Sequence, residues 1–189
     1  VRYAATVETE RVAADYRALA KVPMHQLPAE AVQYLNESRY CASNKFMHFV
    51  HDEFAGVEGG AKIGAMRDWI EHHFTYAAGS SDSETNALDS FVERRGVCRD
   101  YAHVMVSLAR AAAIPARVVS VYALGVEPQD FHAVAEVFLD GEWHLVDATG
   151  MAKETEMAKI AVGRDAADIS LLTAYGDIQM LNQKVTVER

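Results

Sequence analysis

Three residues of this sequence could act together as a nucleophile, a base and an orienting acid. Cys98 lies in residues 96–103 (GVCRDYAH), at the start of an alanine-rich apolar stretch. His132 opens a strand-like apolar run, and Asp147 closes the next one. A thiolate can attack an amide or ester carbonyl while a histidine transfers the proton and a carboxylate holds the imidazole. These three residues therefore predict acyl-transfer chemistry.

The element that must position Cys98 is a helix over about residues 98–113. Apolar side chains recur on one face, and Ile114-Pro115 stops the helix. The free N–H groups and the dipole at the first turn of a helix favour an anion, which is the setting of reactive cysteines. We expect the backbone N–H of Cys98 to be one donor to the oxyanion that forms during attack.

A hairpin must position the other two residues. Residues 131–139 and 142–146 alternate as strands, and Asp140-Gly141 between them is a strong two-residue turn signal. In that register Asp147 lies opposite Val134, one diagonal step from His132 and on the same face. Diagonal neighbours are about 7–8 Å apart at the backbone, within side-chain reach. A slip of one residue would put the two on opposite faces.

The remaining chain predicts an α+β domain, with helices packed on a mostly antiparallel β-sheet. Helices are expected over about residues 27–35, 44–54, 61–74 and 87–94, with Ser43 as a cap of the second, a break at Gly59-Gly60 and an end of the last at Gly96. Strands are expected over residues 117–123, near Ile160, near Ile178 and over residues 185–187.

Residues 1–9 alternate in a strand-like way. We expect residues 1–10 to be the end of an N-terminal β domain that is missing from this chain. An edge strand of the same domain is nearly as good an interpretation. Residues 11–189 then form the enzyme core.

Composition excludes some classes of function. The net charge is −9, from 27 acidic and 18 basic residues, and basic residues never cluster beyond pairs such as Arg94-Arg95. This argues against a nucleic-acid partner. The sequence has no apolar run long enough to span a membrane and no recognisable signal peptide. We expect a cytoplasmic protein, although the sequence starts at Val1, so that targeting information could precede it. The sequence leaves the oligomeric state open.

Other residues offer alternatives. Cys41 and Cys98 could form one disulfide, but such sparse cysteines favour free thiols. His48, His51 and the pair His72-His73 could suggest zinc, but their spacing fits no zinc motif. We therefore expect no metal or other cofactor.

Two polar residues near the three reactive positions have weaker claims. His103 comes five residues after Cys98 and so lies on another helix face, which argues against its being the base. Glu136 shares the His132 face of the hairpin, and we expect it to join a salt bridge across the sheet.

The motifs resemble the transglutaminase-like superfamily, above all the bacterial transglutaminase-like enzymes described as cysteine proteases. The resemblance rests on residues 95–103 (RGVCRDYAH), 130–133 (DFHA) and 143–149 (WHLVDAT). It also takes in residues 38–41, 69–76, 114–117 and 163–168, and so covers most of the chain after residue 27.

This resemblance implies a papain-like fold and acyl transfer through a thioester, with Cys98, His132 and Asp147 as the catalytic triad. Animal members use a tryptophan as the second oxyanion donor, and Tyr76 is our substitute for it. We expect hydrolysis of amide bonds, peptide or isopeptide, in a peptide or protein substrate, rather than transfer to an amine, because nothing in the sequence identifies an amine site. The alternative is a non-enzymatic papain-like module that binds peptides or assembles with partners.

Overall fold

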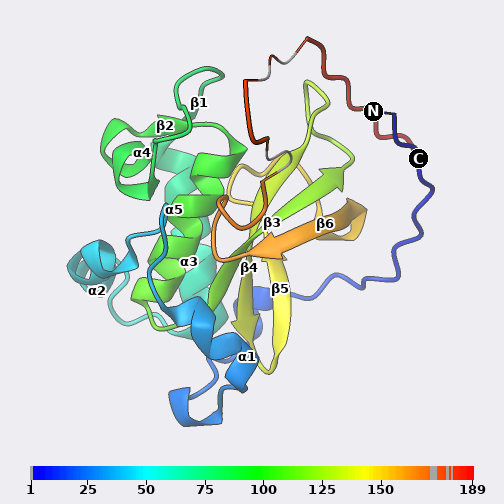
Figure 1. The fold of residues 1–189 in the computed structure, drawn as a ribbon. Helices are drawn as coiled ribbons and strands as arrows, with labels where there is room; N and C mark the ends of the chain where they lie inside the picture. The colour runs from blue at the N-terminus through cyan, green and yellow to red at the C-terminus, as the bar shows by residue number, and fades with distance from the viewer. Residues whose placement is uncertain (1, 171–173, 178, 180) are drawn as a thin grey trace.

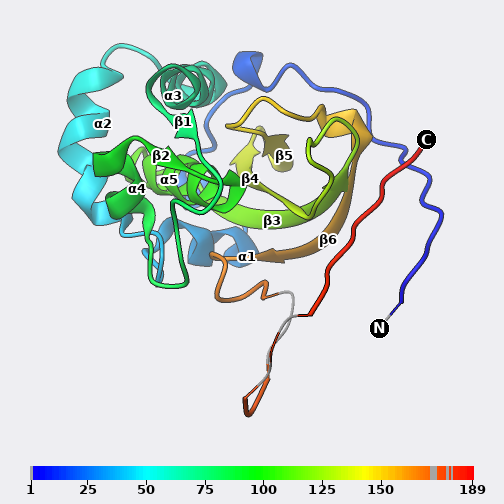
Figure 2. The same cartoon turned by 90° about the horizontal axis from the view of Figure 1, so that it is seen from above.

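A buried helix and a curved sheet form the two layers of this protein. The computed structural model describes residues 2–170, 174–177, 179 and 181–189. Helix α5 (Cys98–Ala111) packs on the sheet, and the other large helices lie on the same side of it (Figure 1). Seen from above, the sheet curls away from helices α2 to α5 (Figure 2). The predicted α+β class is confirmed.

The main sheet has four antiparallel strands in the order β5-β4-β3-β6. They are β3 (Ala116–Ala123), β4 (His132–Leu139), β5 (Glu142–Val146) and β6 (Met157–Gly163). The turn between β4 and β5 has φ of 50° at Asp140 and 88° at Gly141, as a hairpin turn of this length requires. Leu139 pairs with Glu142 and Ala135 with Val146. The predicted hairpin register is therefore confirmed.

The helical layer is made of short elements around α5. The α-helices are α1 (Ala29–Val32), α2 (Met47–Glu53), α3 (Gly59–His73) and α4 (Ala87–Glu93). The 3-10 turns are η1 (Tyr16–Ala18), η2 (Met24–Gln26), η3 (Gln33–Leu35), η4 (Ser43–Phe46) and η5 (Glu154–Glu156). Two short strands, β1 (Thr75–Tyr76) and β2 (Arg95–Gly96), pair in parallel beside the start of α5. No helix of the described ranges is long and apolar enough to cross a membrane.

Two apolar clusters make up the core of this protein. The larger one joins α5 to α3, to η4 and to one face of the sheet, and its members include Ile63, Met66, Ile70, Met105, Leu108, Ile114, Val137 and Leu139. The smaller one fills the inside of the curved sheet with Val119, Val121, Val134, Leu145 and Met157. Each such side chain contributes about 1.5–3 kcal/mol when fully buried, so the start of α5 and the hairpin rest on a rigid base.

Several predicted boundaries are wrong. Ala42 rather than Ser43 occupies the cap position, and Ser43 is buried inside a 3-10 turn. Gly59-Gly60 does not break the chain but begins α3. Helix α4 ends at Glu93, close to the expected residue 94, but its cap is Arg94 and not Gly96. Arg94 takes the left-handed conformation with φ of 56°, and its guanidinium stacks on the Phe91 ring at 4.1 Å, which favours this conformation despite the strain.

The chain ends differ from the prediction as well. Residues 2–9 and 185–187 form no strand, so the edge-strand interpretation of the N-terminal segment is wrong. Both segments run along the outside of the fold, on the side away from α2 (Figures 1 and 2). Ile178 lies outside the described residues, and the strand expected there is not tested.

Candidate active site

Cys98 is the first residue of α5, and the local sequence fixes the start of that helix. Val97 is extended, with φ of −106° and ψ of −179°, and its N–H donates to Asp100 Oδ2 at 2.8 Å. The Asp100 side chain is fully buried. It packs so closely on Gly96 that a Cβ there would lie 2.6 Å from Asp100 Cβ. The thiol of Cys98 is free and partly exposed.

His132 and Asp147 are joined by a hydrogen bond. His132 Nε2 lies 3.0 Å from Asp147 Oδ2. Both side chains are withdrawn from solvent, with exposures of 0% and 4%. The bond joins the first residue of β4 to the residue after β5, which is the diagonal relationship expected of the hairpin.

The turn that follows Asp147 saturates its carboxylate. Oδ1 accepts from the Thr149 N–H at 2.9 Å and from the Thr149 hydroxyl at 2.7 Å. Oδ2 accepts from the Ala152 N–H at 3.0 Å in addition to His132. Burial alone would raise the pKa of Asp147, but the bonds from His132 and Thr149 outweigh it and lower the pKa. The carboxylate is therefore ionised and held in one orientation.

The environment of His132 favours the imidazolium. Burial lowers the pKa of His132, but the hydrogen bond to Asp147 and the adjacent Cys98 thiol outweigh this effect and raise the pKa to about 9. The Nδ1 atom is buried and has no hydrogen-bond partner in the described part of the chain. Because Nε2 faces the carboxylate, Nδ1 is the nitrogen available to the Cys98 thiol.

Tyr76 lies beside Cys98 as well. It pairs with Gly96 in the small parallel sheet, two residues before Cys98. Burial raises the pKa of Tyr76, and the Cys98 charge raises it further. The phenol is thus protonated at neutral pH and can donate a hydrogen bond next to the thiol.

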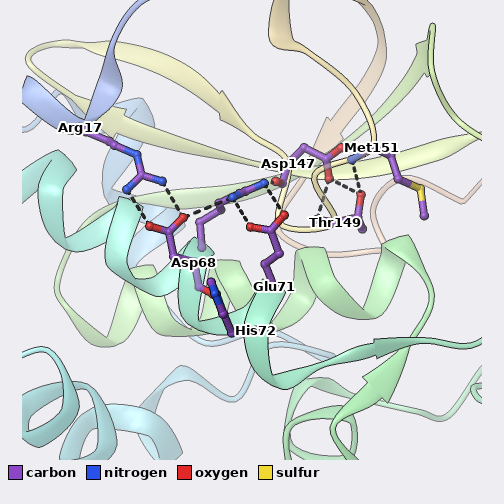
Figure 3. A network of polar contacts seen from close by, with 8 residues as sticks. Arg17, Asp68, Glu71, His72, Asp147, Thr149 and Met151 are labelled. Carbon is purple, nitrogen blue, oxygen red and sulfur yellow. Dashed lines mark hydrogen bonds and ion pairs between the residues drawn. The ribbon is translucent and has the colours of Figure 1, made fainter.

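Helix α3 supports the Asp147 turn from behind (Figure 3). Arg67 Nε donates to the Asp147 main-chain oxygen at 3.3 Å, and its two other nitrogens bind Glu71 at 2.5 and 3.1 Å. Arg17 makes a two-bond ion pair with Asp68, at 2.8 and 2.6 Å. Asp68 also contacts Arg67 at 3.3 Å. This network of charged residues connects η1 and α3 to the end of β5.

The structure does not bring the other candidate residues to this site. Cys41 is buried, forms no disulfide and points its thiol at the His103 carbonyl oxygen, 3.6 Å away. The ring nitrogens Nδ1 of His72 and His73 contact carbonyl oxygens of their own helix, at 2.7 and 2.8 Å. Among the residues that the structure describes, no group of three or more His, Cys, Asp or Glu side chains is arranged to hold a metal.

Two other polar residues considered in the sequence have structural roles. Glu136 is buried and forms ion pairs with Arg117 on β3, at 2.7 Å, and with Lys159 on β6, so the predicted salt bridge across the sheet is confirmed. His103 is buried within α5, and its Nε2 accepts from the Ala166 N–H at 3.1 Å. Burial lowers the pKa of His103 to about 4, so the ring is neutral.

Sequence reasoning missed the residues that support the site. Thr149 ends the motif of residues 143–149, but the motif by itself does not indicate the two bonds of Thr149 to Asp147. A threonine two residues after an aspartate is nevertheless a common turn partner. No pattern in the sequence indicates the role of Arg67, because its partner Asp147 lies 80 positions further along the chain.

Comparison with known proteins identifies the family of this chain. The model of the transglutaminase-like superfamily, for its core domain, matches residues 29–148. The chain belongs to this superfamily. The resemblance read from the sequence motifs is thereby confirmed.

Two solved structures and one further protein sequence are similar to this chain. A Cytophaga hutchinsonii protein named "Putative Cysteine Protease" has 41% identity and a TM-score of 0.81, over 84% of this chain and 55% of that one. The periplasmic domain of TgpA from Pseudomonas aeruginosa has 25% identity and a TM-score of 0.52, over 66% and 48%. An uncharacterised Mycobacterium leprae protein is 32% identical over 122 residues, 59% of this chain and 43% of its own length. The chain thus spans about half the length of these relatives.

Proposed function

We propose that this transglutaminase-like protein is a cysteine hydrolase that cleaves amide bonds, peptide or isopeptide, in peptides or proteins. The observation that carries the proposal is the buried bond of 3.0 Å between His132 and Asp147, together with the Cys98 thiol that acts on the same imidazole. The family membership and the Cytophaga hutchinsonii relative support the same reaction class.

Each residue of the triad has a role that its surroundings favour. Cys98 is the nucleophile, at the positive end of α5. His132 is paired with it as imidazolium, since the pKa of His132 is raised to about 9. Asp147 fixes the ring through Nε2, so that Nδ1 remains directed at sulfur and at the leaving group.

The reaction has two steps. The Cys98 thiolate attacks the amide carbon, and the C–N bond breaks as His132 gives its Nδ1 proton to the leaving amine. The product on the enzyme is a thioester. Neutral His132 then removes a proton from water, the hydroxide attacks the thioester carbonyl, and the Cys98 sulfur leaves as thiolate while His132 is again protonated.

Two donors would stabilise the oxyanion in both steps. One is the backbone N–H of Cys98, and the second is the protonated phenol of Tyr76. Donors of this kind contribute about 2.7–4 kcal/mol each when they are placed where the negative charge develops. Water rather than an amine accepts the acyl group in this proposal, because water reaches any partly exposed thioester and no residue marks an amine site.

The test is to mix the protein with an activated peptide ester and to follow Cys98 by intact mass. We expect a transient thioester adduct in the native chain and none in Cys98→Ala, while Cys41→Ala leaves the adduct unchanged because Cys41 is buried. An adduct and turnover in Cys98→Ala would refute the mechanism. Adding a primary amine would then compare transfer with hydrolysis directly.

A further inference from the structure

The C-terminal segment lies on the loop that leads into His132. This loop connects β3 to β4 over residues 124–131. Gln129 Nε2 donates to the Val187 main-chain oxygen at 2.8 Å, and Gln129 Oε1 accepts from the Val187 N–H at 3.2 Å. Gln183 Nε2 donates to Asp130 Oδ1 at 2.6 Å. A segment about 55 positions away in sequence is therefore held by two consecutive residues of the loop.

The Gln129 side chain contacts only main-chain atoms of the C-terminal segment. A side-chain amide that binds both the N–H and the C=O of one residue reproduces the pairing of a neighbouring strand. Main-chain bonds of this kind give affinity for an extended peptide irrespective of its side chains, as in strand addition at a sheet edge. Residues 183–189 have no regular secondary structure and are mostly exposed, and they follow a drawn-out course to the C-terminus (Figure 2).

The loop is also close to the proposed chemistry. Gln129 and Asp130 precede His132 by three and two residues. The pKa of Tyr76 is raised by burial and by Cys98, and Asp130 adds to the effect, so the carboxylate acts electrostatically on the residue beside the nucleophile. A peptide on this loop would thus lie along the segment that leads into His132.

We propose that Gln129 and Asp130 form a subsite for the main chain of an extended peptide substrate, and that residues 183–187 occupy this subsite within the same chain. The inference rests on the proposed function, because the bound peptide is the acyl donor of that reaction. A tethered segment has an effective concentration of about 1 mM, so it competes with a substrate of moderate affinity.

The experiment measures peptide binding without catalysis. Fluorescence anisotropy follows a labelled extended peptide, whose sequence is unrelated to residues 181–189, as it binds the full chain carrying Cys98→Ala. Adding Val187→Pro removes the N–H that donates to Gln129 Oε1 and should release the tethered segment. We expect it to strengthen binding of the labelled peptide about threefold to tenfold. Adding Gln129→Ala instead removes the subsite and should weaken binding by a similar factor.

The opposite signs of the two effects distinguish a binding site from a structural strap. If the loop only fastens the segment, both substitutions release it, and peptide binding changes in the same direction or not at all. Either result overturns the proposal, as does the lack of binding to the Val187→Pro chain. Glu127→Gln, at another exposed residue of the loop, should leave binding unchanged. Thioester formation in a chain that keeps Cys98 reports separately on the proposed function.

Discussion

Arg67 and Asp147 are joined through the main chain rather than through their charges. The guanidinium donates from Nε to the Asp147 carbonyl oxygen at 3.3 Å, while its other nitrogens are held by Glu71. The Asp147 carboxylate faces the opposite way, toward His132. Helix α3 thus fixes the peptide unit whose side chain orients the imidazole.

Replacing Arg67 by Gln should therefore reduce kcat/KM for a peptide ester about tenfold. A hydrogen bond from a charged group contributes about 1.5–3 kcal/mol, and 1.4 kcal/mol of transition-state stabilisation corresponds to a factor of ten. Steady-state kinetics measures the loss. The pKa of His132, followed by NMR, should fall together with activity, because the bond to Asp147 is less well held.

Asp68→Asn is the matched control for Arg67. It weakens the ion pairs of Asp68 with Arg17 and with Arg67 but leaves Arg67 bound to Asp147 and Glu71. We expect kcat/KM to change less than twofold and the pKa of His132 to stay near 9. Equal losses in the two variants would mean that α3 acts only on stability.

Asp147→Asn should move the pKa of His132 in a defined direction. Burial lowers the pKa of His132, and Asp147 is the main group that opposes burial. Without the carboxylate charge, we expect the pKa to fall from about 9 toward the ordinary value of about 6.5, since Cys98 alone then opposes the effect of burial. NMR titration of the ring protons would measure the shift. Alkylation of Cys98 by iodoacetamide should slow at pH 6–8, because the imidazolium partner is lost. A pKa that stays near 9 would contradict this assignment.

The hairpin and α5 could be predicted from sequence because their causes are local. Asp140-Gly141 sets the turn, the turn sets the register, and the register puts His132 next to Asp147. The apolar spacing after Cys98 similarly defines a helix that is buried along nearly its whole length. The geometry of the candidate site follows from these two elements.

The supporting contacts could not be predicted, because they depend on packing. Gly96 was interpreted as a helix end, but its lack of a Cβ serves the contact with Asp100. The left-handed turn falls at Arg94, where stacking on Phe91 favours it. The pairing of β1 with β2 involves two residues in each strand, too few for any periodic pattern. Arg67 and Asp147 meet only once α3 is placed against β5.

Stability should fall on acidification because of His103. Its folded pKa is about 4, below the unfolded value of about 6.5. The unfolded chain therefore binds a proton between pH 6.5 and 4 that the folded chain refuses, and stability that is fully present above pH 6.5 is lost across this interval. The loss from this residue is about 3 kcal/mol. Thermal unfolding as a function of pH measures it.

His103→Gln tests this source of acid sensitivity. The glutamine can accept from the Ala166 N–H in place of Nε2 but does not titrate. We expect a lower melting temperature at pH 7, owing to imperfect packing, and a flatter dependence between pH 6.5 and 4. If the slope stays as steep as in the native chain, groups other than His103 cause the loss of stability in acid.

Tyr76→Phe separates oxyanion stabilisation from nucleophile activation. The substitution removes only the phenolic hydroxyl that is protonated beside Cys98, since the pKa of Tyr76 is raised by burial and by the Cys98 charge. Loss of one oxyanion donor costs about a hundredfold in kcat. Alkylation by iodoacetamide builds no oxyanion, so its rate should change less than threefold. Pre-steady-state acylation by a peptide ester and alkylation kinetics, measured on the same sample, make the comparison. If both rates fall together, Tyr76 acts on the thiol itself, and the second oxyanion donor must be sought elsewhere.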